Sequence, residues 1–350
     1  MHNVRSKNSK NGSNLLHRKI QRLGASSLIV TLPKEWARRH GIKVGDILTL
    51  YDEGDKLVIA PNDESYKIRL KFNLGHTHVE RHAKRLILCS YVFGFDEVTF
   101  YSQKTLKKEY IQKLKSMEEL LPDINIEEDF NKVHVKMKHI GKEATLIDKL
   151  VEYGRLISRL YADYIEYLKG SRPLTREELD GKYKHLMKIN YMLLRTANSV
   201  KSYNKAHERK CRYMVSASNL IGIVADSAYK LGLDLISMAS RLSEDEKERL
   251  SFLLQLLEVA LSTTVFSIRP PSVRKSEESY YKVRDILNME GDLDEIITNS
   301  SPAFAYFVAK IMEIARIIEI AEHIMLCNAL IEKYNEPEFG IENNKHTRYI

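Results

Sequence analysis

Residues 24–48 constrain the fold more than any other stretch of this 350-residue chain. They read GASSLIVTLPKEWARRHGIKVGDIL, which predicts a strand over 27–32, a short helix over 34–39, a turn and a second strand over 47–51. Pro33 suits the start of the helix, and Gly41 suits a left-handed residue at its end. A hairpin turn then leads to a strand over 57–59. So short a segment cannot bury a core alone, so it must pack on another surface, most simply on a copy of itself.

Positive charge is concentrated around this segment. Residues 1–45 contain ten Lys and Arg and one acid, a net charge of +9, whereas the whole chain carries +8. The remaining residues are therefore about neutral. Such a local excess of charge is typical of a surface that contacts nucleic acid, although a solvated basic tail gives the same composition.

The motif S-L-x-V-T-L-P-K-x-W followed by G-I-K-x-G-D resembles the SpoVT/AbrB family of swapped-hairpin DNA-binding domains. The resemblance covers residues 14–61 or so. It implies that two chains intertwine into one small barrel that presents basic side chains to DNA. The candidate DNA-binding residues are Arg18, Lys19, Arg22, Lys34, Arg38 and Arg39.

These basic residues also have a structural interpretation. Arg18, Lys19 and Arg22 lie on a predicted first strand over 15–24, where charge protects an open strand edge against pairing with other chains. Arg38 and Arg39 end the short helix, where cations suit the negative helix terminus. We favour DNA contact for the first three and leave the last two as second candidates.

Residues 63–141 are expected to form a small α/β domain. Strands are predicted over 66–72, 97–101 and 132–137, and helices over 79–93 and 106–121, which gives a βαβαβ outline. Nothing in this region resembles a catalytic motif.

From residue 140 onward the apolar spacing is helical throughout. Six helices are predicted, at about 143–169, 175–204, 207–240, 244–268, 274–299 and 302–334. Ser243 with Glu246 three residues later forms a capping-box pattern at the start of the fourth. Helices of this length imply an elongated bundle.

A weak internal repeat relates the third and sixth of these helices. The run Val224-Ala225-Asp226-Ser227 matches Ile320-Ala321-Glu322-His323 at an offset of 96 residues. Two tandem three-helix units with these runs resemble the PhoU family of phosphate-uptake regulators, over about residues 142–335. The order of a SpoVT/AbrB-like module, an α/β linker and this bundle resembles an archaeal-type layout.

The PhoU resemblance also implies a metal site. The family pattern E-x-x-x-D places two carboxylates one helical turn apart, where they can bind metal ions that prefer oxygen ligands. Here the first acid of each pair is replaced, by Gly222 and by Ile318. The remaining candidates for a divalent metal are Asp226, Glu319, Glu322 and His323. The alternative, which we favour, is that they are polar residues on the exposed edge of a bundle helix.

The predicted fold class is therefore multidomain: a small all-β swapped-hairpin dimer module, a small α/β linker domain and an all-α bundle of two three-helix units. The expected boundaries are 1–13 for a disordered basic tail, 14–62, 63–141 and 142–337 for the three domains, and 338–350 for a polar tail. Three widely separated cysteines fit free thiols in a reducing cytoplasm, and we expect no membrane span.

These features predict a cytoplasmic, homodimeric regulator of transcription that binds DNA and responds to a ligand or partner linked to phosphate uptake. The alternative is a dimeric regulator that binds no DNA and contacts a phosphate transporter's cytoplasmic ATPase or a signalling protein. No phosphate loop, nucleophile elbow or dense metal cluster indicates an enzyme. An antitoxin role also uses this kind of module, but the large C-terminal region argues against it.

Overall fold

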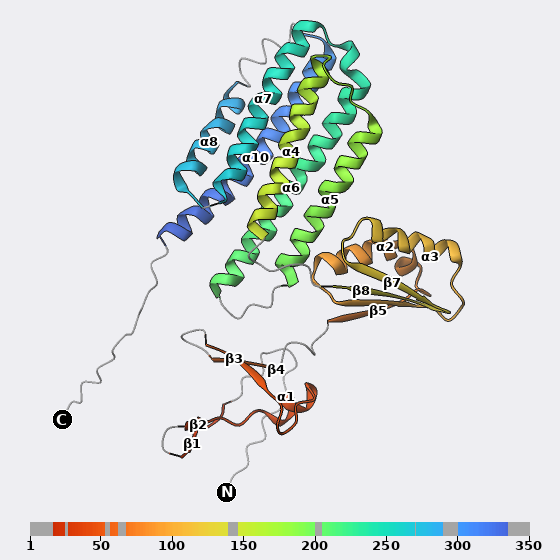
Figure 1. Cartoon of the computed structure of the whole chain (residues 1–350), viewed down its shortest axis with the longest axis vertical. Coiled ribbons are helices and arrows are strands. Elements are labelled where there is room, and N and C mark those ends of the chain that lie inside the picture. Colours follow the sequence, from red (N-terminus) through yellow and green to blue (C-terminus); the bar gives the residue numbers. More distant parts are fainter. Residues whose placement is uncertain are drawn as a thin grey trace, which may run out of the picture. The chain divides into compact units, whose positions relative to one another are not determined.

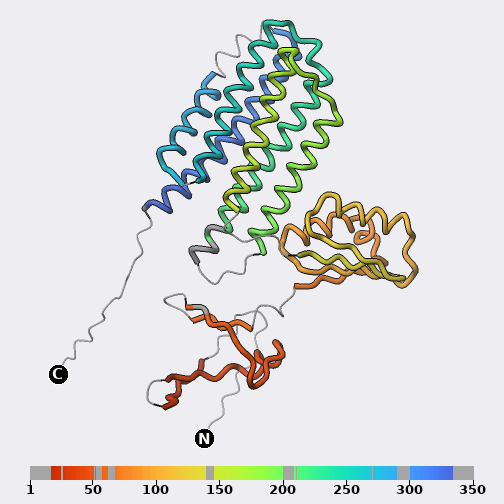
Figure 2. The backbone as a smooth tube through the Cα atoms, viewed as in Figure 1, coloured from red at the N-terminus to blue at the C-terminus, as the bar shows by residue number. Residues whose placement is uncertain are grey.

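The chain divides near residue 66 into two compact units, which are described separately (Figures 1 and 2). The computed structural model describes residues 17–24, 27–52, 57–61, 68–138, 146–199, 205–269, 271–289 and 300–334. The predicted tails at 1–13 and 338–350 lie outside the described residues.

The first unit contains two short antiparallel strand pairs and one helix. Strand β1 (Gln21–Leu23) pairs with β2 (Ser27–Ile29), and β3 (Leu48–Asp52) pairs with β4 (Leu57–Pro61). Helix α1 (Lys34–Arg39) has the predicted bounds. The first strand is shorter than the predicted 15–24, because β2 offers only three residues with which it can pair.

Tight turns around α1 follow from the local sequence. Gly41 and Gly45 have φ values of +66° and +97°, a region in which a side chain would be strained. Pro33 occupies the cap position just before the helix, not its first turn. The Asp46 carboxylate accepts a hydrogen bond from the Lys43 amide at 2.8 Å and closes the turn that leads to β3.

The second unit begins with an α/β domain whose sheet has the order β5-β6-β8-β7. Its elements, in chain order, are β5 (Arg69–Asn73), α2 (Thr77–Val92), β6 (Glu97–Tyr101), α3 (Lys108–Lys115), a 3-10 turn (Ser116–Glu119), β7 (Ile124–Asp129) and β8 (Lys132–Met137). Strands β5 and β6 are parallel, and the other neighbours are antiparallel. The prediction missed β7, because INIEED carries acidic residues where a strand would carry apolar ones.

Helices α2 and α3 cover one face of this sheet (Figure 1). Val98, Phe100, Val133 and Val135 are fully buried and pack with Ile87 of α2 in one core. Alternate strand positions face the other way and carry polar side chains, as expected for a sheet that is covered on one side.

Six long helices form the rest of the second unit (Figure 1). They are α4 (Leu146–Leu168), α5 (Arg176–Ser199), α6 (Lys205–Met238), α7 (Glu244–Ser267), α8 (Val273–Asn288) and α10 (Pro302–Tyr334). All six predicted helices are present, with bounds that differ by a few residues. Residues 290–299 of the predicted fifth helix lie outside the described residues.

The helices surround one continuous apolar core. Helix α4 packs closely on α7, and a Cβ at Gly154 would come within 2.1 Å of the Val265 side chain, so only glycine fits there. The capping box at Ser243 and Glu246 is present, and the Glu246 carboxylate also accepts a hydrogen bond from the Ser301 amide at 2.7 Å. One carboxylate therefore holds the starts of α7 and α10.

Helix α7 is long and apolar enough to cross a membrane by length and composition alone. It is the one such helix among the described residues. Of its most apolar window, 56% is buried inside the bundle, so much of its apolar surface contacts other helices of the chain.

A buried arginine joins the α/β domain to the bundle. Arg195 of α5 is 0% exposed, and its guanidinium donates hydrogen bonds to the backbone carbonyls of Tyr91, Phe95, Met137 and Lys138 at 2.9–3.2 Å. The same group lies 4.9 Å from the centre of the Tyr91 ring. Burial lowers the pKa of this guanidinium, but an arginine stays charged, so the carbonyl oxygens must compensate for its lost hydration.

Replacing this arginine should weaken the second unit as a whole. We expect Arg195→Lys to lower the free energy of unfolding by about 3 kcal/mol, because one ammonium group cannot satisfy four carbonyls in the geometry of a guanidinium fork. Urea unfolding measures the loss, and hydrogen exchange should show faster opening of the C-terminal end of α5. Arg176→Lys, at an exposed position of the same helix, is the control. Equal stability of the two variants would contradict the anchoring role.

Candidate functional site

Among the described residues of the first unit, the lysine and arginine side chains are all exposed. Arg22 lies in β1, whereas Arg18 and Lys19 precede the strand in a segment without regular secondary structure. Lys34 and Arg39 lie at the two ends of α1. Arg38 is held by an ion pair with Glu35 at 2.8 Å. The expectation that Arg18, Lys19 and Arg22 share one strand is therefore wrong, although the three remain close in sequence and open to solvent.

The first unit leaves most of its apolar side chains exposed. Among its described residues, Ala60 is the one buried hydrophobic side chain. The exposed apolar residues are Ile20, Leu23, Leu28, Ile29, Val30, Val44, Ile47, Leu50 and Leu57. A segment with this much open apolar surface needs a partner to be stable.

Asp226 lies on α6 in polar contact with Tyr183 of α5 and with Lys230. Its carboxylate accepts a hydrogen bond from Tyr183 at 2.9 Å and pairs with Lys230 at 2.6 Å. The Tyr183 and Tyr229 rings stack with centres 4.1 Å apart, and the Tyr229 hydroxyl bonds to Asp180. Burial acts to raise the pKa of Asp226, but Lys230 and Tyr183 outweigh it, so the net pKa is lowered.

The sequence did not reveal this tyrosine pair. Tyr183 is on α5 and Tyr229 on α6, and nothing in the spacing of either residue predicts a contact between helices. At Gly222, the position one turn before Asp226, a Cβ would lie 2.6 Å from the Asn190 amide nitrogen. A carboxylate at this position would therefore require Asn190 to move.

The other three candidate ligands lie on α10 in different environments. Glu319 forms an ion pair with Arg284 at 3.2 Å, and the His323 ring lies 5.4 Å from that of Tyr280. Glu322 is 0% exposed, so the expectation of an exposed helix edge is wrong for this residue. Within the described ranges, no three His, Cys, Asp or Glu side chains are grouped to hold a metal ion. A metal bound by these residues stays a prediction.

Glu322 is a buried acid without a hydrogen-bond partner on either carboxylate oxygen. Thr264 and Ser279 lie nearby, but their hydroxyls bond to each other at 2.8 Å. Burial raises the pKa of the Glu322 carboxyl to about 7, an effect that these hydroxyls partly offset. The group is therefore neutral in the folded protein at mildly acidic pH and charged only at higher pH.

This burial should make stability depend on pH. Between pH 4.5 and about 7 the folded protein holds a proton on Glu322 that the unfolded chain has released, so stability falls as the pH rises through this window. We expect the wild type to lose on the order of 3 kcal/mol relative to Glu322→Gln between pH 5 and pH 8. Urea unfolding at both pH values measures the difference. Parallel pH profiles for the two proteins would contradict the assignment.

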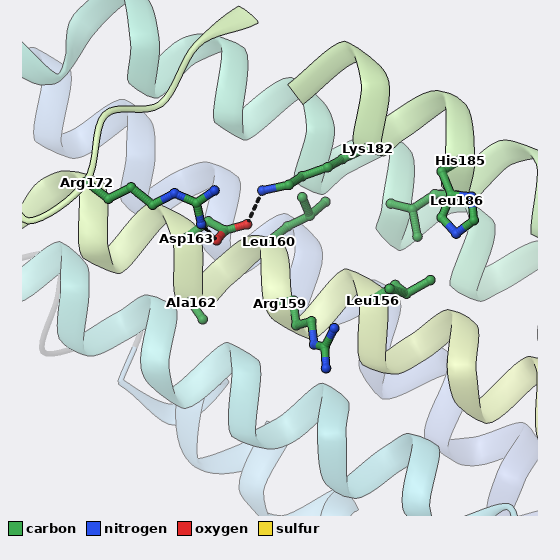
Figure 3. Close-up of a pocket in the computed structure, with 9 residues that line it drawn as sticks. All are labelled: Leu156, Arg159, Leu160, Ala162, Asp163, Arg172, Lys182, His185 and Leu186. Atoms are coloured by element: carbon green, nitrogen blue, oxygen red, sulfur yellow. Dashed lines mark hydrogen bonds and ion pairs between the residues drawn. The ribbon is translucent and has the colours of Figure 1, made fainter. Parts of the chain in front are cut away.

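A cavity of about 390 Å³ lies between α4 and α5 (Figure 3). Its lining comprises Leu156, Arg159, Leu160, Ala162, Asp163, Arg172, Lys182, His185 and Leu186. Asp163 accepts from Arg172 at 2.6 Å and from Lys182 at 2.7 Å, and both cations also contact Glu178. These two cations are therefore paired with carboxylates, whereas Arg159 and His185 also line the cavity beside its apolar side chains.

Comparison with known proteins identifies one part of the chain. Residues 21–67 match the family model described as "Antidote-toxin recognition MazE, bacterial antitoxin". No curated protein matches the chain. The match covers the strand pairs and α1 but none of the α/β domain or bundle. The N-terminal unit thus contains a MazE/AbrB-like domain.

Proposed function

We propose that the protein is a cytoplasmic, DNA-binding regulator of transcription that dimerises through residues 14–62. The observation that carries the proposal is the MazE/AbrB-like domain with a net charge of +9 over residues 1–45. Clustered cations bind the phosphate backbone without regard to sequence and fix the protein on the duplex. Arg18, Lys19 and Arg22 are the first candidates for this contact.

Dimerisation is supported by the apolar surface of the same unit. Nine large apolar side chains are exposed there, and a second copy would cover them as the swapped-hairpin arrangement requires. Covering them would complete a core that one chain cannot build. The basic residues of both chains would then lie on one dimer.

The helical bundle is the proposed sensor, tied to phosphate uptake. The PhoU-like runs around Asp226 and Glu322 and the succession of six long helices support this reading. The mechanism is linkage: a ligand or partner that favours one bundle arrangement changes the affinity of the dimer for DNA, and DNA changes the affinity for the ligand by the same factor.

The family match favours a second candidate, an antitoxin that neutralises a toxin protein. Co-expression with neighbouring genes and isolation of a stable complex distinguishes the two functions. A toxin that copurifies with the chain, and whose activity the chain suppresses, would support the second. The roughly 280 residues that follow the matched segment are more than neutralisation requires, so we place regulation first.

The charge contact can be tested directly. Replacing Arg18, Lys19 and Arg22 with Ala should weaken binding to duplex DNA, and the slope of log K against log salt should fall by about 0.9 for each lost phosphate contact. Gel shift and fluorescence anisotropy at several salt concentrations give both quantities. The matched control replaces the exposed residues Lys71, Lys108 and Lys132 of the α/β domain with Ala. Unchanged binding by the first variant would favour the transporter-ATPase alternative.

The dimer interface can be tested separately. Leu28→Asp places a charge on a side chain that is 69% exposed in the single chain but buried in the proposed dimer. We expect weaker self-association in analytical ultracentrifugation, because burying an unpaired charge costs several kcal/mol. Phe130→Asp, at a 75% exposed position of the α/β domain, is the control. A dissociation constant of the dimer that Leu28→Asp leaves unchanged would rule out this surface as the interface.

A further inference from the structure

The cavity between α4 and α5 has the size of a small-molecule site and an apolar floor (Figure 3). Its volume of about 390 Å³ falls within the roughly 300–1,000 Å³ of ligand pockets, and an apolar hole of about 150 Å³ already admits benzene. Leu160 and Leu186 are each 2% exposed, and the partly buried Leu156 and Ala162 complete the apolar lining. The cavity therefore has room for an apolar body of one or two rings.

An ion-pair network closes one end of this cavity. Asp163 of α4, whose side chain is 15% exposed, accepts from Arg172 with one oxygen and from Lys182 of α5 with the other (Figure 3). Glu178 also contacts both cations. Two cations and two carboxylates leave the network without net charge. Because it joins α4 to α5 through the segment between them, it ties the two helices together at this end.

Arg159 and His185 add a charge and hydrogen-bond donors that this network does not use. Both line the cavity and are exposed, Arg159 on α4 and His185 on α5. Within the part of the chain that the structure describes, neither side chain has a hydrogen bond or ion pair. Arg155, one turn earlier on α4, instead lies over the Phe266 ring at 4.9 Å. The cavity therefore keeps a guanidinium that no carboxylate of the described residues neutralises.

We infer that this cavity binds a small organic anion, with an apolar body packed on the leucines and a negatively charged group bound by Arg159 and His185. The inference deepens the proposed sensor role of the bundle, and it rests on that role only in treating the ligand as an effector. A guanidinium binds a carboxylate or a phosphate through a planar fork of donors. An imidazole can donate a further hydrogen bond in either of its charge states.

The apolar floor distinguishes such a ligand from inorganic phosphate. A free phosphate ion in the cavity would face Leu156, Leu160 and Leu186 with oxygens that lose their hydration and gain no donors there, which is unfavourable. An apolar body instead removes its own surface and that of the leucines from water. The cavity therefore favours an anionic group attached to a hydrocarbon or aromatic body over a free anion.

The position of the cavity on α5 gives a bound ligand a route to the α/β domain. The same helix carries Arg195, whose guanidinium donates to four backbone carbonyls of that domain. His185 and Arg195 are separated by about 15 Å along the helix. A ligand that changes the position of α5 therefore acts directly on the helix that anchors the α/β domain.

Calorimetry on the full chain without DNA tests this binding apart from the regulatory function. The probes are 1-naphthyl phosphate and 1-naphthoate as organic anions, 1-naphthalenemethanol as a neutral analogue, and inorganic phosphate as an anion without an apolar body. We expect at least one organic anion to bind about tenfold more tightly than both the neutral analogue and inorganic phosphate. A preference for the phosphate ester or for the carboxylate identifies which anionic group the site takes.

Two substitutions locate the bound anion. Arg159→Gln should lower the affinity for the organic anion about tenfold and leave that for the neutral analogue unchanged, because only the anion uses the guanidinium. Ala162→Phe should fill the cavity and weaken the binding of both. Arg155→Gln removes the same charge one turn away on α4, so this matched control should change neither affinity. Circular dichroism checks that each variant folds.

Three outcomes would overturn the inference. Equal losses in Arg155→Gln and Arg159→Gln would mean that the surface attracts anions without a specific site. Inorganic phosphate that binds as tightly as the organic anions would mean that the leucines take no part. The absence of binding by either organic anion at millimolar concentration would exclude the site altogether. None of these results depends on DNA binding, which the triple replacement of Arg18, Lys19 and Arg22 tests separately.

Discussion

The close contact between α4 and α7 is the constraint on which the bundle depends. At Gly154 the two helices approach so closely that any Cβ would overlap Val265. This contact fixes the rotation of α7 about its own axis: Val265 faces α4, and its neighbour Phe266 faces solvent. The exposure of Phe252, Val259 and Phe266 on α7 is therefore a consequence of how tightly its inner face is packed. The Glu246 carboxylate accepts hydrogen bonds from the Ser243 and Ser301 amides and so ties the start of α7 to the start of α10.

Much of the fold is predictable because it rests on local rules. Helix α1 begins after Pro33 and ends before Gly41 as proline and glycine chemistry requires, and the capping box at Ser243 has its predicted partner. The six helices follow from apolar periodicity. Strand β7 could not be predicted in this way, because pairing with β8 stabilises it and its own residues do not.

The candidate sites were less predictable because they depend on contacts between distant elements. Spacing on α10 indicates that Glu319 and His323 share a face, but only the fold shows that Glu322 is buried without a partner. Tyr183 contacts Asp226, and Asn190 lies against Gly222, so both contacts join α5 to α6. The residue pattern of neither helix predicts them. The basic cluster near residue 20 could be recognised in the sequence, because counting charges along the chain requires no knowledge of tertiary contacts.

Arg195 has an evolutionary consequence. Four of its acceptors are main-chain carbonyls, so the α/β domain contributes to this contact mainly through its backbone, with the Tyr91 ring and the Met137 sulfur beside the guanidinium. Substitutions at Phe95, Met137 and Lys138 can preserve the hydrogen bonds provided that the backbone keeps its path. Related chains can therefore diverge widely on this side of the joint while the arginine is retained. Correlated substitutions would be a poor guide to the contact, because the hydrogen-bond acceptors in it are main-chain carbonyls, which substitutions do not change.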